Sequence, residues 1–127
     1  MIIMFSIHVI AWKGLNIYEH VPWFDFPEHF AGGLVTAWTL YRLYLIGQNN
    51  WKFTIQPQGL LYLFLIGMTA LVAVLWEFHE FAHDVLFPNL PPYQLGQWDT
   101  MHDLFMGILG ATVWCIRLHF APRKKIN

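Results

Sequence analysis

The amino-acid sequence predicts an all-α integral membrane protein, a bundle of four or alternatively three transmembrane helices. Hydrophobic residues make up 57% of the 127 residues and charged residues only 12%, against about 25% charged residues in an ordinary soluble domain. The apolar residues also fall into long runs without strand-like alternation. Because backbone groups cannot stay unpaired in lipid, we expect these runs to be helices. The length leaves room for one helical domain, residues 1–127.

The expected helices cover approximately residues 1–18, 27–46, 59–86 and 99–120. The first spans a bilayer only if it continues to about Tyr18, because its apolar run is shorter than the roughly 20 residues required; otherwise three spans remain. The second begins at Pro27, whose missing N–H costs nothing in a first helical turn. The third contains the run LLYLFLIGMTALVAVL, the strongest spanning pattern in the chain. Pro and polar turn residues separate the later helices.

Basic and acidic residues separate to opposite ends of this expected bundle. Six of the seven basic residues fall at one end: Arg42, Lys52, Arg117, Arg123, Lys124 and Lys125. All eight acidic residues fall at the other: Glu19, Asp25, Glu28, Glu77, Glu80, Asp84, Asp99 and Asp103. The positive-inside rule assigns the basic end, with the C-terminus, to the cytoplasm. The acidic end is then expected in the outer half of the bilayer.

Three short stretches at the acidic end combine carboxylates with histidine: DFPEHFAGG, WEFHEFAHD and WDTMHDLFMG. Residues three or four apart share a helix face. The sequence therefore predicts three polar stripes, one on each helix: Glu77 with Glu80 and Asp84, Asp25 with His29, and Asp99 with Asp103. Glycines continue the last two stripes, and glycine on a helix face lets membrane helices approach closely.

Clustered carboxylates near hydrocarbon are costly, by about 2.5–3.5 kcal/mol each on insertion scales, and a divalent cation would offset several at once. Oxygen ligands with imidazole suit Zn, Mn or Fe. Glu80-x-x-His83 also has the glutamate–histidine spacing that is found in di-iron helix bundles. Asp99-x-x-His102 has the same spacing, with aspartate in place of glutamate. The candidate metal ligands are Glu77, Glu80, Asp99, Asp103, Asp25 and His29, with His83 and His102 as second choices.

Other interpretations of the same residues remain open at this point. Shared protons or histidinium partners could offset the charges in place of a metal. Asp25 and Asp99 stand where helix N-caps belong, and Glu28, three residues after Asp25, resembles a capping box. Asp84 is equally compatible with a solvated interfacial position. His79 lies away from the carboxylate stripe of its own helix, which favours a packing role.

The blocks W-E-x-x-E and W-D-x-x-x-D-x-x-x-G resemble the uncharacterised YjdF-like family of small bacterial inner-membrane proteins and, more loosely, VanZ-like membrane proteins. The matching positions are Asp25, His29, Trp76, Glu77, Glu80, Gly96, Trp98, Asp99, Asp103 and residues 107–111. The chain is shorter than is expected of the YjdF-like family. The resemblance implies a bacterial inner (cytoplasmic) membrane location and acidic positions that act as a set. It implies no particular reaction.

The expected function is divalent metal binding, with metal-assisted hydrolysis or transfer on a lipid-linked substrate if the protein is an enzyme. A covalent Ser or Cys mechanism is disfavoured, because no such nucleophile accompanies a base. One alternative is an accessory subunit of a larger membrane complex, or a homo-oligomer. Another is haem or chlorophyll ligation by histidines such as His29, His79, His83 or His102. No nucleic-acid partner is expected, because RKK near the C-terminus is the only basic cluster.

Overall fold

The computed structural model describes residues 22–121. These residues form a short 3₁₀ helix and three long α-helices, without any strand: η2 (Pro22–Phe24), α3 (Asp25–Trp51), α4 (Gln58–Leu86) and α5 (Gln97–Phe120). The helices expected over residues 27–46, 59–86 and 99–120 are therefore present, with α3 longer at both ends. The helix expected over residues 1–18 lies outside the described residues.

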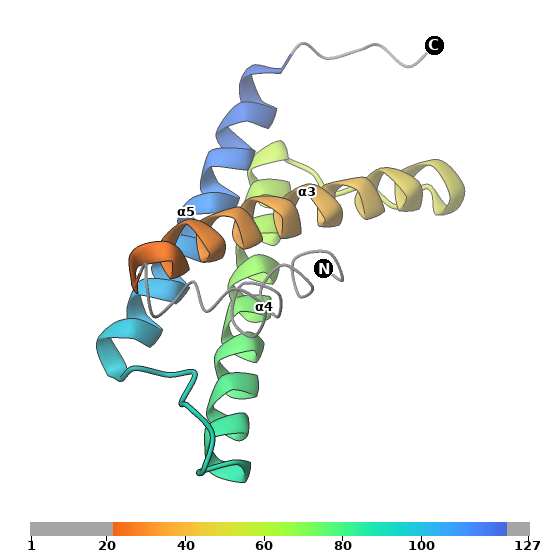
Figure 1. Ribbon diagram of the computed structural model, residues 1–127. Coiled ribbons are helices and arrows are strands. Elements are labelled where there is room, and N and C mark those ends of the chain that lie inside the picture. Colours follow the sequence, from red (N-terminus) through yellow and green to blue (C-terminus); the bar gives the residue numbers. More distant parts are fainter. Residues whose placement is uncertain (1–21, 122–127) are drawn as a thin grey trace.

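Two of the three α-helices, α4 and α5, are long and apolar enough to cross a membrane. The third, α3, carries Asp25, Glu28, His29 and Arg42 among its apolar residues and does not meet that criterion. It also runs across α4 and α5 instead of alongside them (Figure 1). The expectation of four spanning helices is therefore not confirmed, and the described part of the chain supports two candidate spans.

The outward surfaces of the candidate spans are apolar. Leu63 and Phe78 of α4 and Ile116 of α5 each expose more than half of their surface. Contiguous exposed apolar surface is unusual for a soluble monomer. Lipid or a partner helix would cover these side chains.

The main contact in the described fold joins α3 to α5, and it brings the two backbones together at glycines. A Cβ atom on Gly33 would overlap the carbonyl oxygen of Gly107, and one on Gly110 would overlap that of Phe30. Only hydrogen fits at these two positions, as in close helix crossings within membranes. At Gly32, in contrast, an added methyl group would meet no neighbour within 4 Å. Of the two adjacent glycines of α3, only Gly33 is therefore needed for the close approach of the backbones.

An apolar cluster closes the opposite part of the fold. Tyr44 of α3, Leu61 and Leu65 of α4, and Cys115 of α5 are buried together there. This cluster lies toward the end of α3 and α5 and the start of α4. The acidic residues lie toward the other ends of the same helices. The apolar cluster and the glycine crossing together hold α3 against α5.

Candidate metal centre

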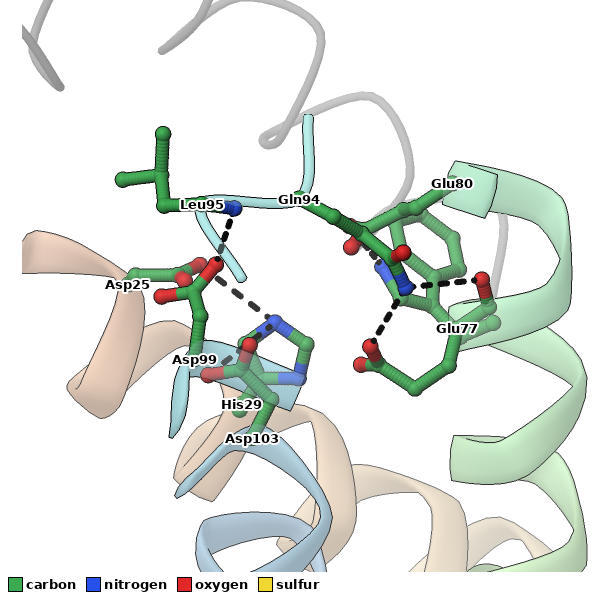
Figure 2. A network of polar contacts seen from close by, with 9 residues as sticks. Asp25, His29, Glu77, Glu80, Gln94, Leu95, Asp99 and Asp103 are labelled. Carbon is green, nitrogen blue, oxygen red and sulfur yellow. Dashed lines mark hydrogen bonds and ion pairs between the residues drawn. The ribbon is translucent and has the colours of Figure 1, made fainter. Parts of the chain in front are cut away.

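Asp25, His29 and Asp103 form a compact polar cluster in which one ligand atom from each lies within 4.8 Å of the others. The Nε2 atom of His29 is 3.3 Å from Oδ1 of Asp25 and 3.8 Å from Oδ1 of Asp103. Asp25 and His29 stand one turn apart on α3, while α5 supplies Asp103 (Figure 2). Gly33 lies one turn after His29 on α3, and Gly107 lies one turn after Asp103 on α5. The glycine crossing therefore sets the separation between His29 and Asp103.

Asp103 is the most deeply buried acid of the cluster. Its side chain is 1% exposed, and Oδ1 accepts no hydrogen bond from the part of the chain that the structure describes. A buried carboxylate oxygen without a donor is costly unless a cation is near. Part of the compensation comes from the helix starts, because α3 and α5 both begin beside the cluster and carry Asp25 and Asp99 in their first turns. Helix N-termini favour negative charge there.

A second pair of buried acids faces this cluster from α4. Glu77 and Glu80 are each 5% exposed. Trp76 Nε1 donates to Glu80 Oε1 at 2.7 Å, and this bond fixes the Glu80 carboxylate. Both glutamates interact electrostatically with His29. Figure 2 shows the His29 ring between the aspartates and the glutamates.

Gln94, in the loop between α4 and α5, holds Glu77. Its Nε2 atom donates to Oε2 and to the backbone oxygen of Glu77, at 3.2 Å in each case. Thr100 of α5 also interacts with the Glu77 carboxylate. The other carboxylate oxygen, Oε1, is buried and has no hydrogen-bond partner of normal geometry among residues 22–121. Sequence reasoning missed Gln94, because an amide in PPYQLGQ has neither a charge nor a helical spacing that links it to Glu77.

Asp84 anchors the same loop. Its two carboxylate oxygens accept hydrogen bonds from the backbone N–H groups of Tyr93, at 2.8 Å, and Gln94, at 3.0 Å. The anchor places the Gln94 side chain over Glu77. Partial burial and the nearby carboxylates of Glu80 and Asp84 raise the pKa of Tyr93 above its ordinary value, so the phenol stays neutral at physiological pH.

The interpretation of Asp99 as the N-cap of its helix is wrong, because Asp99 lies inside the first turn of α5 and no side chain caps that helix. The Oδ2 atom of Asp99 accepts a hydrogen bond from the backbone N–H of Leu95 at 3.0 Å, just before α5 begins. The N-cap of α5 is Gly96, at a positive φ of 123° that favours glycine. Asp25 makes no capping bond at the start of α3. Asp99 therefore borders the cluster while fixing the loop that enters it.

The two histidines named as second choices lie elsewhere. His83 contacts Asp84 at 3.2 Å and packs against Tyr93, so it belongs to the loop anchor. His102 is exposed and packs beside Phe26 and Trp98. The structure thus brings the ligand atoms of Asp25, His29 and Asp103 together. Glu77 and Glu80 interact electrostatically with His29, and Asp99 does so with Asp103. His83 and His102 lie outside the cluster.

The fold and the centre together define a class of protein: a helical membrane protein with a buried acid–histidine cluster. The chain belongs to the family described as "Predicted membrane protein (DUF2238)", whose model matches residues 1–124. It is also 33% identical over 104 residues to an uncharacterized protein of Thermotoga maritima, covering 82% of this chain and 52% of that relative. The chain thus spans about half the length of this curated relative.

No solved structure matches the chain. The family match confirms that the sequence belongs to an uncharacterised family of membrane proteins. The YjdF-like and VanZ-like resemblances stay predictions, as does the bacterial inner-membrane location.

Proposed function

We propose that this membrane protein binds a divalent cation, Zn, Mn or Fe, between Asp25, His29 and Asp103. The observation that carries the proposal is the convergence of three ligand atoms within 4.8 Å from two different helices. Two carboxylates and one imidazole form a donor set that suits these metals. Oδ1 of Asp103 supplies a buried ligand atom that accepts no hydrogen bond from the described residues.

The position of His29 explains how the cluster is balanced before metal binds. A proton on Nε2 places a positive charge between Asp25 and Asp103, at the distances found here. A metal ion at the same nitrogen replaces that proton and keeps both carboxylates paired. Because ligands must be deprotonated to bind metal, the affinity for the cation falls as pH falls.

Metal analysis of the purified protein tests this proposal. The protein is prepared without chelators, and the bound metal per chain is measured for the wild type and for Asp103→Asn, which keeps the side-chain shape. We expect stoichiometric metal in the wild type and its loss in Asp103→Asn. His102→Gln is the matched control, because His102 lies one residue away but faces outward, and it retains the metal. A wild-type protein without bound metal overturns the proposal.

The more specific proposal is metal-assisted hydrolysis or transfer on a lipid-linked substrate at the outer half of the bilayer. A bound cation would polarise a phosphoryl or carbonyl oxygen. The supporting observation is that α4 and α5, which carry part of the centre, expose large apolar side chains that lipid would cover. The free thiol, Cys115, lies in the separate apolar cluster, so it offers no nucleophile there. Incubation with lipid phosphates and lipid esters, followed by product analysis, tests the activity; no turnover of either class with metal-loaded protein contradicts it.

A second proposal is that the protein acts as a subunit of a larger membrane assembly or as a homo-oligomer. The observation that favours it is the set of large apolar side chains exposed on the outside of α4 and α5. Cross-linking in native membranes, followed by mass analysis, tests it. A monomer as the only species contradicts this proposal and leaves the metal proposal intact.

A further inference from the structure

We propose that the centre binds two divalent cations, and that Asp103 is shared between them. The first ion is the one placed at Asp25, His29 and Asp103, so the inference rests on the proposed function. The second ion lies between Asp103 and the two glutamates of α4, Glu77 and Glu80. Two-metal sites hold their ions about 3.5–4 Å apart, and a shared carboxylate is a common bridge in helix bundles.

Two orphaned oxygens point to the second ion. Oε1 of Glu77 and Oδ1 of Asp103 are both buried without a hydrogen-bond partner in the described residues, although their side chains come from different helices. Glu77 is 5% exposed and Asp103 is 1% exposed, so these atoms are shielded from bulk solvent. A cation between the two helices would bind both oxygens.

The glutamates are held in place on the side away from this ion. Gln94 donates to Oε2 of Glu77, and Trp76 donates to Oε1 of Glu80. Each bond orients a carboxylate without adding a positive charge. Figure 2 shows the Glu77 carboxylate reaching from α4 toward His29, and electrostatic interaction between Glu77 and Asp103 is present. Neutral donors of this kind position metal ligands from outside.

The charge balance favours two ions over one. Five carboxylates surround or border the centre: Asp25, Asp99, Asp103, Glu77 and Glu80. One divalent ion would offset two of these negative charges and two ions would offset four. The Lys and Arg side chains of residues 22–121, which are Arg42, Lys52 and Arg117, belong to the other ends of α3 and α5. A proton on His29 adds one positive charge in the metal-free protein, and a second cation would offset part of the negative charge that remains.

The stoichiometry of Mn²⁺ binding tests the inference. Purified full-length chain is loaded with Mn²⁺, freed of loosely bound ions by gel filtration, and analysed for manganese per chain. We expect two ions in the wild type and one in the double variant Glu77→Gln with Glu80→Gln, which keeps the side-chain size and removes the charge. The control His102→Gln keeps two.

An electron paramagnetic resonance spectrum of the Mn²⁺-loaded wild type provides a second measurement that does not depend on any variant folding. Two ions that share Asp103 give an exchange-coupled spectrum, whereas separate ions give the six-line pattern of isolated Mn²⁺. One ion per chain in the wild type, or two uncoupled ions, overturns the inference and leaves the first metal site standing. A wild type that binds no Mn²⁺, Zn²⁺ or Fe²⁺ overturns the proposed function as well.

Discussion

Asp103 combines deep burial, an oxygen without a donor and a position between two groups of acids. A buried carboxylate oxygen that accepts no hydrogen bond lowers the stability of a fold. The metal-free protein therefore carries a destabilising group at the point where the cation is expected to bind. Such a residue links metal affinity to the free energy of unfolding, because a ligand that binds only the folded state stabilises it.

We predict that the melting temperature of the Asp103→Asn variant no longer depends on added metal. In chelated buffer its melting temperature is expected to equal or exceed that of the wild type, because a neutral amide of the same shape is less costly to bury than the carboxylate. Adding Zn²⁺ or Mn²⁺ at 100 times the dissociation constant stabilises the wild type by about 2.7 kcal/mol and leaves the variant nearly unchanged. Thermal unfolding in detergent measures both. An equal metal-induced rise in the two proteins would count against Asp103 as a ligand.

At the scale of elements, the crossing of α3 and α5 is the contact that builds the centre. Gly33 and Gly110 lie against opposing backbone, where neighbours cannot move aside as a flexible side chain could. Overpacking of such a contact costs about 1–3 kcal/mol.

We predict that Gly33→Ala lowers the free energy of unfolding by about 1–3 kcal/mol and weakens metal binding, because it pushes His29 away from Asp103. Gly32→Ala is the matched control. Its added methyl group meets nothing within 4 Å, and helix propensity would make the change neutral or stabilising by up to about 1 kcal/mol. Equal destabilisation by the two variants in a detergent melt contradicts the crossing as described.

The conformation of the loop between α4 and α5 depends on hydrogen bonds to Asp84. Asp84→Ala removes the acceptors for the Tyr93 and Gln94 amides, each hydrogen bond to a charged group contributing about 1.5–3 kcal/mol at most. Faster hydrogen exchange of both amides is therefore expected, measured by mass spectrometry. Asp84→Asn retains one acceptor oxygen and should exchange at an intermediate rate. Unchanged exchange in Asp84→Ala would show that the anchor is not formed.

At the scale of the whole molecule, polar and apolar groups occupy different ends of the same three helices. The acids meet where α3 and α5 begin, and the apolar cluster lies where they end. In a bilayer this arrangement would place the metal centre near one interface.

The charge distribution predicts that the acidic end faces away from the cytoplasm. Cysteines introduced at Asn89, in the α4–α5 loop, and at Asn50, near the end of α3, test this in intact cells. A membrane-impermeant thiol reagent is expected to label the cysteine at position 89 from outside and to leave the one at position 50 unlabelled. The native Cys115 is buried and gives little background. The reverse labelling pattern would invert the predicted orientation.

Local properties of the chain were sufficient for the helices and for most of the candidate ligands. Apolar runs predict α4 and α5, and helical spacing places Glu77 beside Glu80 and Asp25 beside His29, because both patterns depend on residues close in sequence. Helical spacing could not distinguish the role of Glu80 from that of Asp84, because both lie on the same helix face as Glu77. In the structure Glu80 turns to the centre and Asp84 binds the loop.

The sequence by itself determined that the chain is helical, rich in apolar surface and acidic at one set of helix ends, because composition and periodicity act over one or two turns. Only the tertiary structure decided that α3 crosses the two candidate spans, that Gly33 makes the contact while Gly32 does not, and that Gln94 supports Glu77. These features depend on where backbones cross and how a loop returns, which are contacts between residues far apart in the chain. Local pattern carries no information about such distances.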